Sequence, residues 1–149
     1  MIRILFVCHG NICRSTMAQS VLQHMVNSKG LSGRFEIDSA ATSTEEIGNP
    51  PHYGTVEELR RHNIPVVPHR ARQLMKSDAK RFDYLIGMDS ANIRNMQRIL
   101  SSSEKIYKLM GFADSEKDVA DPWYTGDFAR TYADVSLGCE KLLEKLYNE

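Results

Sequence analysis

The chain has 149 residues, of which 42% are apolar and 26% are charged, as in one ordinary globular domain. Its 19 basic and 19 acidic side chains cancel, so the charge gives no reason to expect a nucleic-acid or membrane partner. The N-terminal apolar stretch is too short for a signal peptide and the number of cysteines is odd, which argues against a disulfide framework and predicts reduced thiols in the cytoplasm.

The first half of the chain predicts two strands, over 2–7 and 35–39, and two helices, over 15–30 and 50–62. Five of the six residues in the first strand are apolar, which indicates a buried strand. Apolar residues then recur at helical spacing, and Gly30 fits the end of the first helix. Two adjacent prolines are expected to open the second helix.

The second half predicts strands over 82–88 and 106–110 and helices over 89–100 and 128–146, with 111–127 mostly loop. An aspartate and a serine can cap the helix at 89–100, because a short side-chain oxygen satisfies free backbone N–H groups. Strands alternate with helices, so the predicted fold class is α/β with a parallel sheet. The loop after the first strand is where such a sheet usually binds ligands.

That loop carries a motif of eight residues between a strand and a helix. They are Cys8, His9, Gly10, Asn11, Ile12, Cys13, Arg14 and Ser15. The backbone N–H groups of such a loop can converge on one anion, and the helix N-terminus adds a favourable dipole. Arg14 offers a planar fork of donors that matches two phosphate oxygens. Gly10 permits an unusual backbone angle, and Asn11 is the non-glycine residue that best tolerates one. The motif therefore predicts a phosphate-binding loop.

Cys8 lies at the mouth of this loop and is the candidate nucleophile. The N–H groups that bind phosphate would also stabilise its thiolate, and a thiolate held against a bound phosphate is already in place to attack. Ser15 is well placed to hydrogen-bond the thiolate and help it leave in a second step. A cysteine and an arginine at this spacing often occur by chance, so the prediction depends on the whole motif.

The motif Cys-x-Gly-Asn-Ile-Cys-Arg-Ser resembles that of the low-molecular-weight protein tyrosine phosphatase family, and the resemblance extends over nearly the whole chain. Similar segments are Asp38-Ser39-Ala40, His69-Arg70-Ala71-Arg72-Gln73, Phe82-Asp83-Tyr84, Met88-Asp89 and Asp121-Pro122-Trp123-Tyr124. The resemblance implies one phosphatase domain over 1–149, with a four-stranded parallel sheet and helices on both faces (a flavodoxin-like or Rossmann-like three-layer fold). It also implies hydrolysis of phosphotyrosine and aryl phosphate monoesters through a phosphocysteine, with no cofactor and no metal.

The reaction needs an acid, because a phenolate leaving group must be protonated and a positioned carboxylic acid contributes about 10²–10⁴-fold. Asp121 is the candidate. Pro122 keeps its backbone away from the helical region, and the family's acid loop has a similar sequence. Asp-Pro is also common in turns, and Asp114 and Asp118 lie nearby as alternative acids.

The substrate ring would need an apolar wall. Trp123 and Tyr124 follow the candidate acid and could form an aromatic side of the pocket, and Ile12 could form the other. Many relatives carry an aromatic residue on the pocket rim where this chain has Glu45 and Glu46. These two carboxylates would repel acidic residues that flank the phosphotyrosine.

The resemblance further implies a supporting shell made of Asn11, Ser15, Ser39 and His69. In the family the matching serine and histidine hydrogen-bond the loop asparagine and hold its strained backbone. A strand-end serine and a partly exposed histidine without that role are the alternative. Arg70 and Arg72 are interpreted as solvated surface charge with no role.

The resemblance also implies that Cys13 forms a reversible disulfide with Cys8 under oxidation, which would protect the nucleophile from irreversible oxidation. The alternative for Cys13 is a small residue packed under the loop. Cys139 falls on an apolar helix and is expected in the core.

Three rival functions stay open. A sister group reduces arsenate with additional downstream cysteines, and between Cys13 and Cys139 this chain has none. Another sister group removes phosphate from arginine, and there the position of Ile12 is usually threonine. A non-catalytic oxyanion-binding module would need loss of the nucleophile or the acid. The expected partners are phosphotyrosine-containing proteins, with inorganic phosphate as product, no nucleic acid, no membrane, and a monomer or weak self-association.

Overall fold

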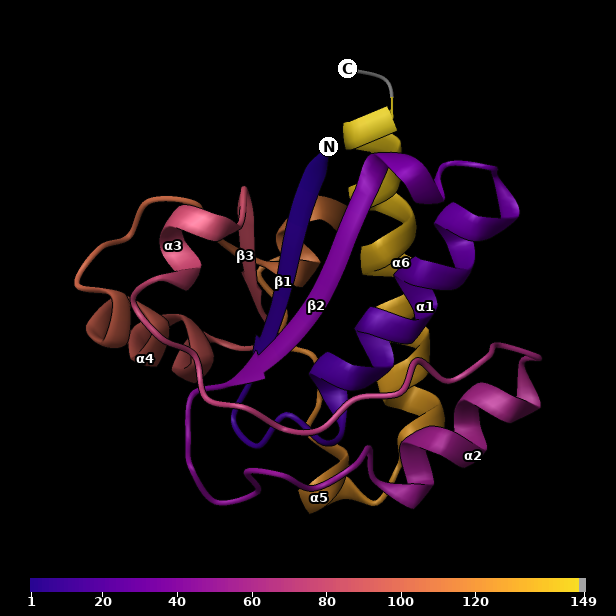
Figure 1. Cartoon of the computed structure of the whole chain (residues 1–149). Helices are drawn as coiled ribbons and strands as arrows, with labels where there is room; N and C mark the ends of the chain where they lie inside the picture. Colours follow the sequence, from indigo (N-terminus) through magenta and orange to yellow (C-terminus); the bar gives the residue numbers. More distant parts are fainter. Residues whose placement is uncertain (148–149) are drawn as a thin grey trace.

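The computed structural model describes residues 1–147, and a parallel sheet of four strands forms its centre (Figure 1). The strands are β1 (Ile2–Cys8), β2 (Phe35–Ala41), β3 (Tyr84–Gly87) and β4 (Ile106–Lys108). They lie in the order β2-β1-β3-β4, and each neighbouring pair runs parallel. The predicted α/β fold with a four-stranded parallel sheet is confirmed.

Helices cover both faces of the sheet. They are α1 (Arg14–Ser28), α2 (Tyr53–Arg61), α3 (Asp78–Arg81), α4 (Ser90–Leu100), α5 (Pro122–Thr125) and α6 (Phe128–Tyr147), with short 3-10 turns η1 (Ser32–Arg34) and η2 (Leu109–Ala113). Figure 1 shows α1 and α6 on one face and α3 and α4 on the other. This arrangement gives the three layers expected from the sequence.

The side chains of β1 alternate between two cores, which explains why the strand is apolar almost throughout. Ile4 and Phe6 pack into the core under α1 and α6, whereas Leu5 and Val7 pack into the core under α4. All four are fully buried. A central parallel strand that is buried on both faces produces such a continuous apolar run.

Several predicted boundaries differ from the structure. The second helix begins at Tyr53, because the side chain of His52 caps it by accepting a hydrogen bond from the Gly54 N–H, and both prolines lie before this cap. The third strand covers Tyr84–Gly87 only, and Phe82 is the extended residue that follows the end of α3 at Arg81. The segment expected as loop between 111 and 127 contains α5 and most of η2.

The strand order positions the site. β1 lies between β2 and β3, so the order reverses at the carboxyl end of β1, where parallel α/β sheets bind ligands. The chain leaves β1 at Cys8 and enters α1 at Arg14, with the loop of interest between them. Within residues 1–147, none of the helices is long and apolar enough to span a bilayer.

Candidate active site

The thiol of Cys8 lies at the base of the loop after β1. Cys8 is 3% exposed, and its Sγ is 3.1 Å from the hydroxyl of Ser15. The backbone N–H of Asn11 donates to the same sulfur at 3.3 Å. Hydrogen-bond donors directed at one sulfur can stabilise the negative charge of a thiolate. The arrangement suits a nucleophile.

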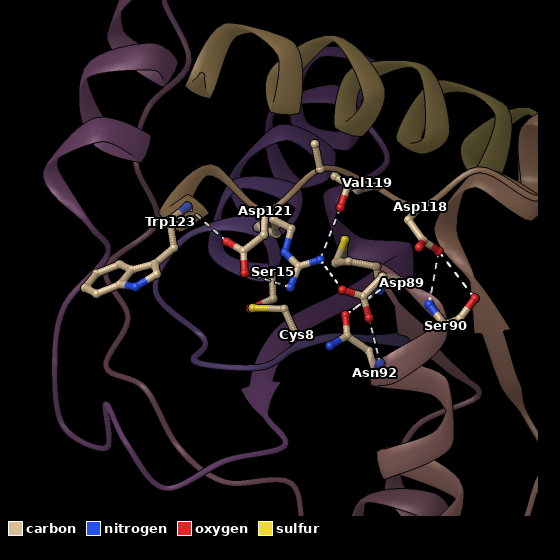
Figure 2. Close-up of polar contacts among 12 residues, drawn as sticks. Cys8, Ser15, Asp89, Ser90, Asn92, Asp118, Val119, Asp121 and Trp123 are labelled. Atoms are coloured by element: carbon tan, nitrogen blue, oxygen red, sulfur yellow. Dashed lines mark hydrogen bonds and ion pairs between the residues drawn. The ribbon is translucent and has the colours of Figure 1, made fainter. Parts of the chain in front are cut away.

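Arg14 is a buried cation beside this thiol. Its guanidinium donates to Asp89 Oδ2 at 2.7 Å and to the carbonyl oxygen of Val119 at 3.1 Å, and it lies 3.4 Å from Asp121 Oδ2 (Figure 2). Burial lowers the pKa of Arg14, but the charge on Cys8 and the hydrogen bond and charges of the two aspartates outweigh burial and raise it. Arg14 therefore keeps its charge and a fixed orientation.

Asp89 holds Arg14 while it also caps a helix. Its side chain accepts the backbone N–H of Asn92, and the Asn92 side chain accepts the backbone N–H of Asp89, which is the reciprocal pattern of a capping box. The predicted cap at the start of α4 is therefore present in the structure. Asp89 follows β3 directly, at the same edge of the sheet as the loop after β1, and this position is the signal that could have linked it to the site.

Asp121 lies across the cavity from the thiol loop. Its backbone is extended, as expected for a residue before proline, and its Oδ1 accepts the Trp123 N–H at 3.0 Å at the start of α5 (Figure 2). The alternatives are engaged elsewhere. Asp118 pairs with Lys108 and accepts the Ser90 N–H, and the hydrogen bond from Lys108 lowers its pKa. Asp114 is the left-handed residue that ends η2.

One cavity brings these groups together. It is lined by Cys8, His9, Gly10, Ile12, Cys13, Arg14, Glu45, Glu46, Asp121, Trp123 and Tyr124. The first turn of α1 adds backbone N–H groups that lack partners within the helix. The predicted nucleophile, cation, acid and wall residues therefore share a single cavity.

The front of the cavity is formed by exposed side chains. Trp123 is 61% exposed and Tyr124 is 84% exposed. Glu45 Oε2 lies 3.0 Å from His9 Nε2, and Glu46 accepts a hydrogen bond from the Asn49 side chain at 2.6 Å. We call Glu45, Glu46, Trp123 and Tyr124 the rim.

The back of the loop is held by buried hydrogen bonds to Asn11. Asn11 has a φ of 60°, in the left-handed region, whereas Gly10, which was expected to permit such an angle, is not among the positive-φ residues. The Asn11 amide donates to Ser15 Oγ at 2.7 Å, and its Oδ1 accepts from His69 Nε2 at 2.7 Å. Ser39 Oγ is 3.2 Å from the same nitrogen. The structure thus brings together the four residues expected to support the loop.

His69 acts in this cluster as a neutral donor. Burial lowers its pKa, the charge of Asp38 opposes that effect, and the charge of Arg72 adds to it, with a net lowering. Because the Asn11 amide is oriented with its oxygen toward the ring, the Nε2 of His69 carries the proton.

Two supporting residues were missed by sequence reasoning. Gln19 accepts a hydrogen bond from Ser39 Oγ at 2.6 Å. Arg72 was interpreted as solvated charge, and this is wrong: its guanidinium contacts Asp78 and Asp38, and its backbone N–H donates to Asn11 Oδ1 at 3.2 Å. No local pattern in the sequence connects Arg72 to Asp38, which lies 34 positions before it.

The other thiols are buried. Burial, followed by the charges of Cys8 and Asp121, raises the pKa of Cys13 to about 12, so Cys13 is a protonated thiol at neutral pH. Cys139 is fully buried on α6, as expected, and burial raises its pKa. All three cysteines are free.

Comparisons with known proteins identify the family of the chain. A family model described as low molecular weight phosphotyrosine protein phosphatase matches residues 3–149. Low molecular weight protein-tyrosine-phosphatase YfkJ of Bacillus subtilis is 40% identical over 100% of this chain and 98% of its own. The crystal structure of YfkJ superposes with a TM-score of 0.95, at 41% identity over 99% of this chain and 96% of that chain.

Two further proteins bear on substrate. The low molecular weight phosphotyrosine protein phosphatase of Homo sapiens is 40% identical over 97% of this chain and 95% of its own. The crystal structure of DARP, a drosophila arginine phosphatase, superposes with a TM-score of 0.88, at 26% identity over 96% of each chain.

Proposed function

The chain belongs to the low molecular weight phosphotyrosine protein phosphatase family, and from that premise we propose that it hydrolyses phosphotyrosine and other aryl phosphate monoesters through a phosphocysteine on Cys8. One observation carries the proposal: a buried thiol, a buried guanidinium and a loop carboxylate line one cavity that opens between exposed aromatic side chains. Each group matches one requirement of phosphate ester hydrolysis.

In the first step the Cys8 thiolate attacks phosphorus, so an S–P bond forms while the bond to the aryl oxygen breaks. Arg14 and the N–H groups of the loop and first turn of α1 bind the equatorial oxygens. Asp121 gives its proton to the departing oxygen.

In the second step water attacks phosphorus and the S–P bond breaks. The Asp121 carboxylate takes a proton from the water, and inorganic phosphate is released. Ser15 donates its hydroxyl hydrogen to the departing sulfur, consistent with the separation of 3.1 Å between Sγ and Oγ. His69 and Ser39 act through Asn11, which holds both the backbone N–H on the sulfur and the amide on Ser15.

The rim sets substrate preference in this proposal. Ile12 and the aromatic pair Trp123 and Tyr124 provide walls for a phenyl ring. The carboxylates of Glu45 and Glu46 border the same cavity, so residues flanking the phosphotyrosine should be neutral or basic rather than acidic. The substrates would then be phosphotyrosine-containing proteins with such flanks.

Phosphoarginine is the second candidate substrate, because the fly arginine phosphatase shares the fold at 26% identity. Ile12 argues against it, since a branched apolar side chain suits an aromatic ring better than a guanidinium group. Arsenate reduction is less favoured, because the sequence between Cys13 and Cys139 contains no further cysteine to relay a disulfide.

A redox role for Cys13 extends the proposal. A peroxide would oxidise the Cys8 thiolate to a sulfenic acid, and the Cys13 sulfur would displace water from it to form the Cys8–Cys13 disulfide. The raised pKa of Cys13 makes this thiol a slow nucleophile while Cys8 is a thiolate. When Cys8 is oxidised its negative charge is lost, and this charge is one of the causes that raise the pKa of Cys13. Chemistry on a free thiolate fits a reducing compartment such as the cytoplasm.

The proposal is tested by assaying the purified protein on p-nitrophenyl phosphate and on matched phosphotyrosine and phosphoarginine peptides. Cys8→Ser should abolish turnover, whereas Cys139→Ala, which alters a thiol outside the cavity, should retain it. We expect the phosphotyrosine peptide to be the better peptide substrate. Turnover by Cys8→Ser would overturn the mechanism, and preference for the phosphoarginine peptide would overturn the substrate assignment.

A further inference from the structure

We propose that Arg72 is a positioning residue of the phosphatase reaction, which orients Asn11 and through it the hydrogen bonds on the Cys8 thiolate. This inference rests on the proposed function and adds a residue to it. The side chain of Arg72 does not line the cavity, so any effect on the reaction must pass through the loop.

The backbone of Arg72 contacts the loop directly. Its N–H donates to Asn11 Oδ1 at 3.2 Å, beside the bond that the same oxygen accepts from His69. Two donors on one oxygen fix the orientation of the Asn11 amide, so that its NH₂ group faces Ser15. The left-handed backbone of Asn11 is strained and persists only where its surroundings hold it.

The segment that carries this N–H has little regular structure of its own. It is attached to the end of β2 by a single bridge between Ala41 and Gln73. Ala41 N–H donates to the Arg72 carbonyl oxygen at 2.7 Å, and Leu74 N–H donates to the Ala41 carbonyl oxygen at 2.7 Å. On its other side the segment is joined to the irregular stretch 48–49, because Ala71 N–H donates to the Asn49 carbonyl oxygen at 2.9 Å and Gly48 N–H donates to the Ala71 carbonyl oxygen at 2.8 Å.

The guanidinium of Arg72 adds a side-chain constraint to these backbone hydrogen bonds. It forms two parallel hydrogen bonds to Asp78, at 3.1 and 3.2 Å, and a third contact to Asp38 at 3.3 Å. Asp78 is 3% exposed and belongs to α3, whereas Asp38 belongs to β2. One planar side chain therefore ties the segment to a strand and a helix.

Asp38 connects Arg72 to the second donor on Asn11. One oxygen of Asp38 contacts the Arg72 guanidinium and the other lies 3.5 Å from His69 Nδ1. Both groups that donate to Asn11 Oδ1 therefore lie beside Asp38, which forms an ion pair with Arg72 and borders the neutral ring of His69. If Arg72 is lost, we expect Asn11 to relax, and the N–H on Cys8 Sγ and the amide on Ser15 to weaken together.

The test is the rate at which iodoacetamide alkylates Cys8 as a function of pH, in wild type, Arg72→Gln and Arg72→Lys. At acidic and neutral pH the rate reports how well the thiolate is stabilised, and at high pH all of the thiol is ionised. We expect Arg72→Gln to slow alkylation about fivefold at low pH and to leave the high-pH rate unchanged, because a weakened charge-assisted hydrogen bond is worth about 1 kcal/mol. Its kcat should fall more than its KM rises.

Arg72→Lys keeps the charge but lacks the fork that spans two carboxylates, so it should fall between wild type and Arg72→Gln. Arg70→Gln removes the same charge from an exposed arginine of the same segment, whose guanidinium donates to the Gly48 carbonyl oxygen, and should behave like wild type. If Arg72→Gln does not fold, the lysine variant decides the question.

A wild-type alkylation profile and wild-type kcat in a folded Arg72 variant would overturn the inference, even if its melting temperature dropped. That result would leave the phosphatase assignment intact. By contrast, a wild-type protein that hydrolyses none of the aryl phosphates would overturn the proposed function itself.

Discussion

The back of the phosphate loop and the rim in front of it are built in opposite ways. Behind the loop, Asn11 and Ser39 are fully buried, and the hydrogen bonds that join them to His69, Ser15 and Gln19 measure 2.6–3.2 Å. In front, the aromatic side chains are mostly exposed and Glu45 is 69% exposed. Buried contacts therefore fix the geometry of the loop, whereas the proposed function leaves substrate choice to side chains that water can screen.

The largest effect on kcat is expected at Asp121, whose carboxylate lies between the loop and the rim. Asp121→Asn keeps the size of the side chain and removes the proton donor, so kcat on a poor leaving group should fall about 10²–10⁴-fold. The loss should shrink on p-nitrophenyl phosphate, whose leaving group needs little protonation. Asp118→Asn is the matched control, because Asp118 pairs with Lys108 instead, and it should retain activity. Equal losses in the two variants would contradict the assignment of the acid.

A substitution behind the loop should reduce both activity and stability. Asn11→Ala leaves the His69 and Arg72 donors without their acceptor and puts alanine at a φ of 60°. We expect about 2–4 kcal/mol less free energy of unfolding and a kcat lower by about tenfold to hundredfold. Denaturant unfolding and steady-state kinetics measure the two effects.

Asn63→Ala is the control for that experiment, since Asn63 also has a positive φ, of 57°, but is exposed. It should lose a little stability and no activity. An Asn11→Ala variant that loses only stability would show that the back of the loop is a scaffold and does not orient the reaction.

His69 should contribute to the way the free energy of unfolding depends on pH. The pKa of His69 is lowered by burial and by Arg72, so above about pH 6.5 the side chain is neutral in both the folded and the unfolded state. As the pH falls below about 6.5, the unfolded state binds this proton more readily, and stability is lost. Urea unfolding at pH 7.5 and 5.5 should show a smaller loss in His69→Gln than in wild type. An identical loss in both would contradict a neutral His69, and His24→Gln serves as control.

The smallest effect should come from the rim. Peptides that differ only in lysine or glutamate beside the phosphotyrosine should differ about twofold to tenfold in kcat/KM, in favour of lysine, because exposed charges contribute little. The ratio should approach one in Glu45→Gln/Glu46→Gln and at high salt. Glu104→Gln/Glu140→Gln removes two remote exposed charges and should leave the ratio intact. If the lysine-to-glutamate ratio of kcat/KM changes neither in the rim variant nor at high salt, these carboxylates have no role in substrate choice.

The sequence predicted the front of the site better than the back. The loop motif lies within eight consecutive residues, and Asp121 was predicted as the acid from the resemblance to the family's acid loop, because Asp-Pro alone is also common in turns. The Arg72 cluster joins residues 38, 72 and 78 across β2, an irregular segment and α3, and only the tertiary fold brings them together. Asp89 was predicted as a cap, and its second role toward Arg14 follows from the order of β1 and β3 in the sheet.

The predicted start of α2 was wrong, because a histidine side chain caps this helix after the two prolines. Two prolines suggested a helix start, but the His52 ring caps the helix two residues later and also stacks on Tyr53 and Phe128. The same ring lies edge-on to Trp123 of the rim, with ring centroids 6.0 Å apart, so the cap of α2 also borders the rim. Such contacts between distant segments have no local sequence signature.

The covalent intermediate is the most direct test of the central claim. The protein would be mixed with excess p-nitrophenyl phosphate, quenched in acid during turnover, digested, and mapped by mass spectrometry. The account predicts phosphate on the peptide that contains Cys8, and no phosphopeptide in Cys8→Ser. Phosphate on another residue, or continued turnover by Cys8→Ser, would contradict it.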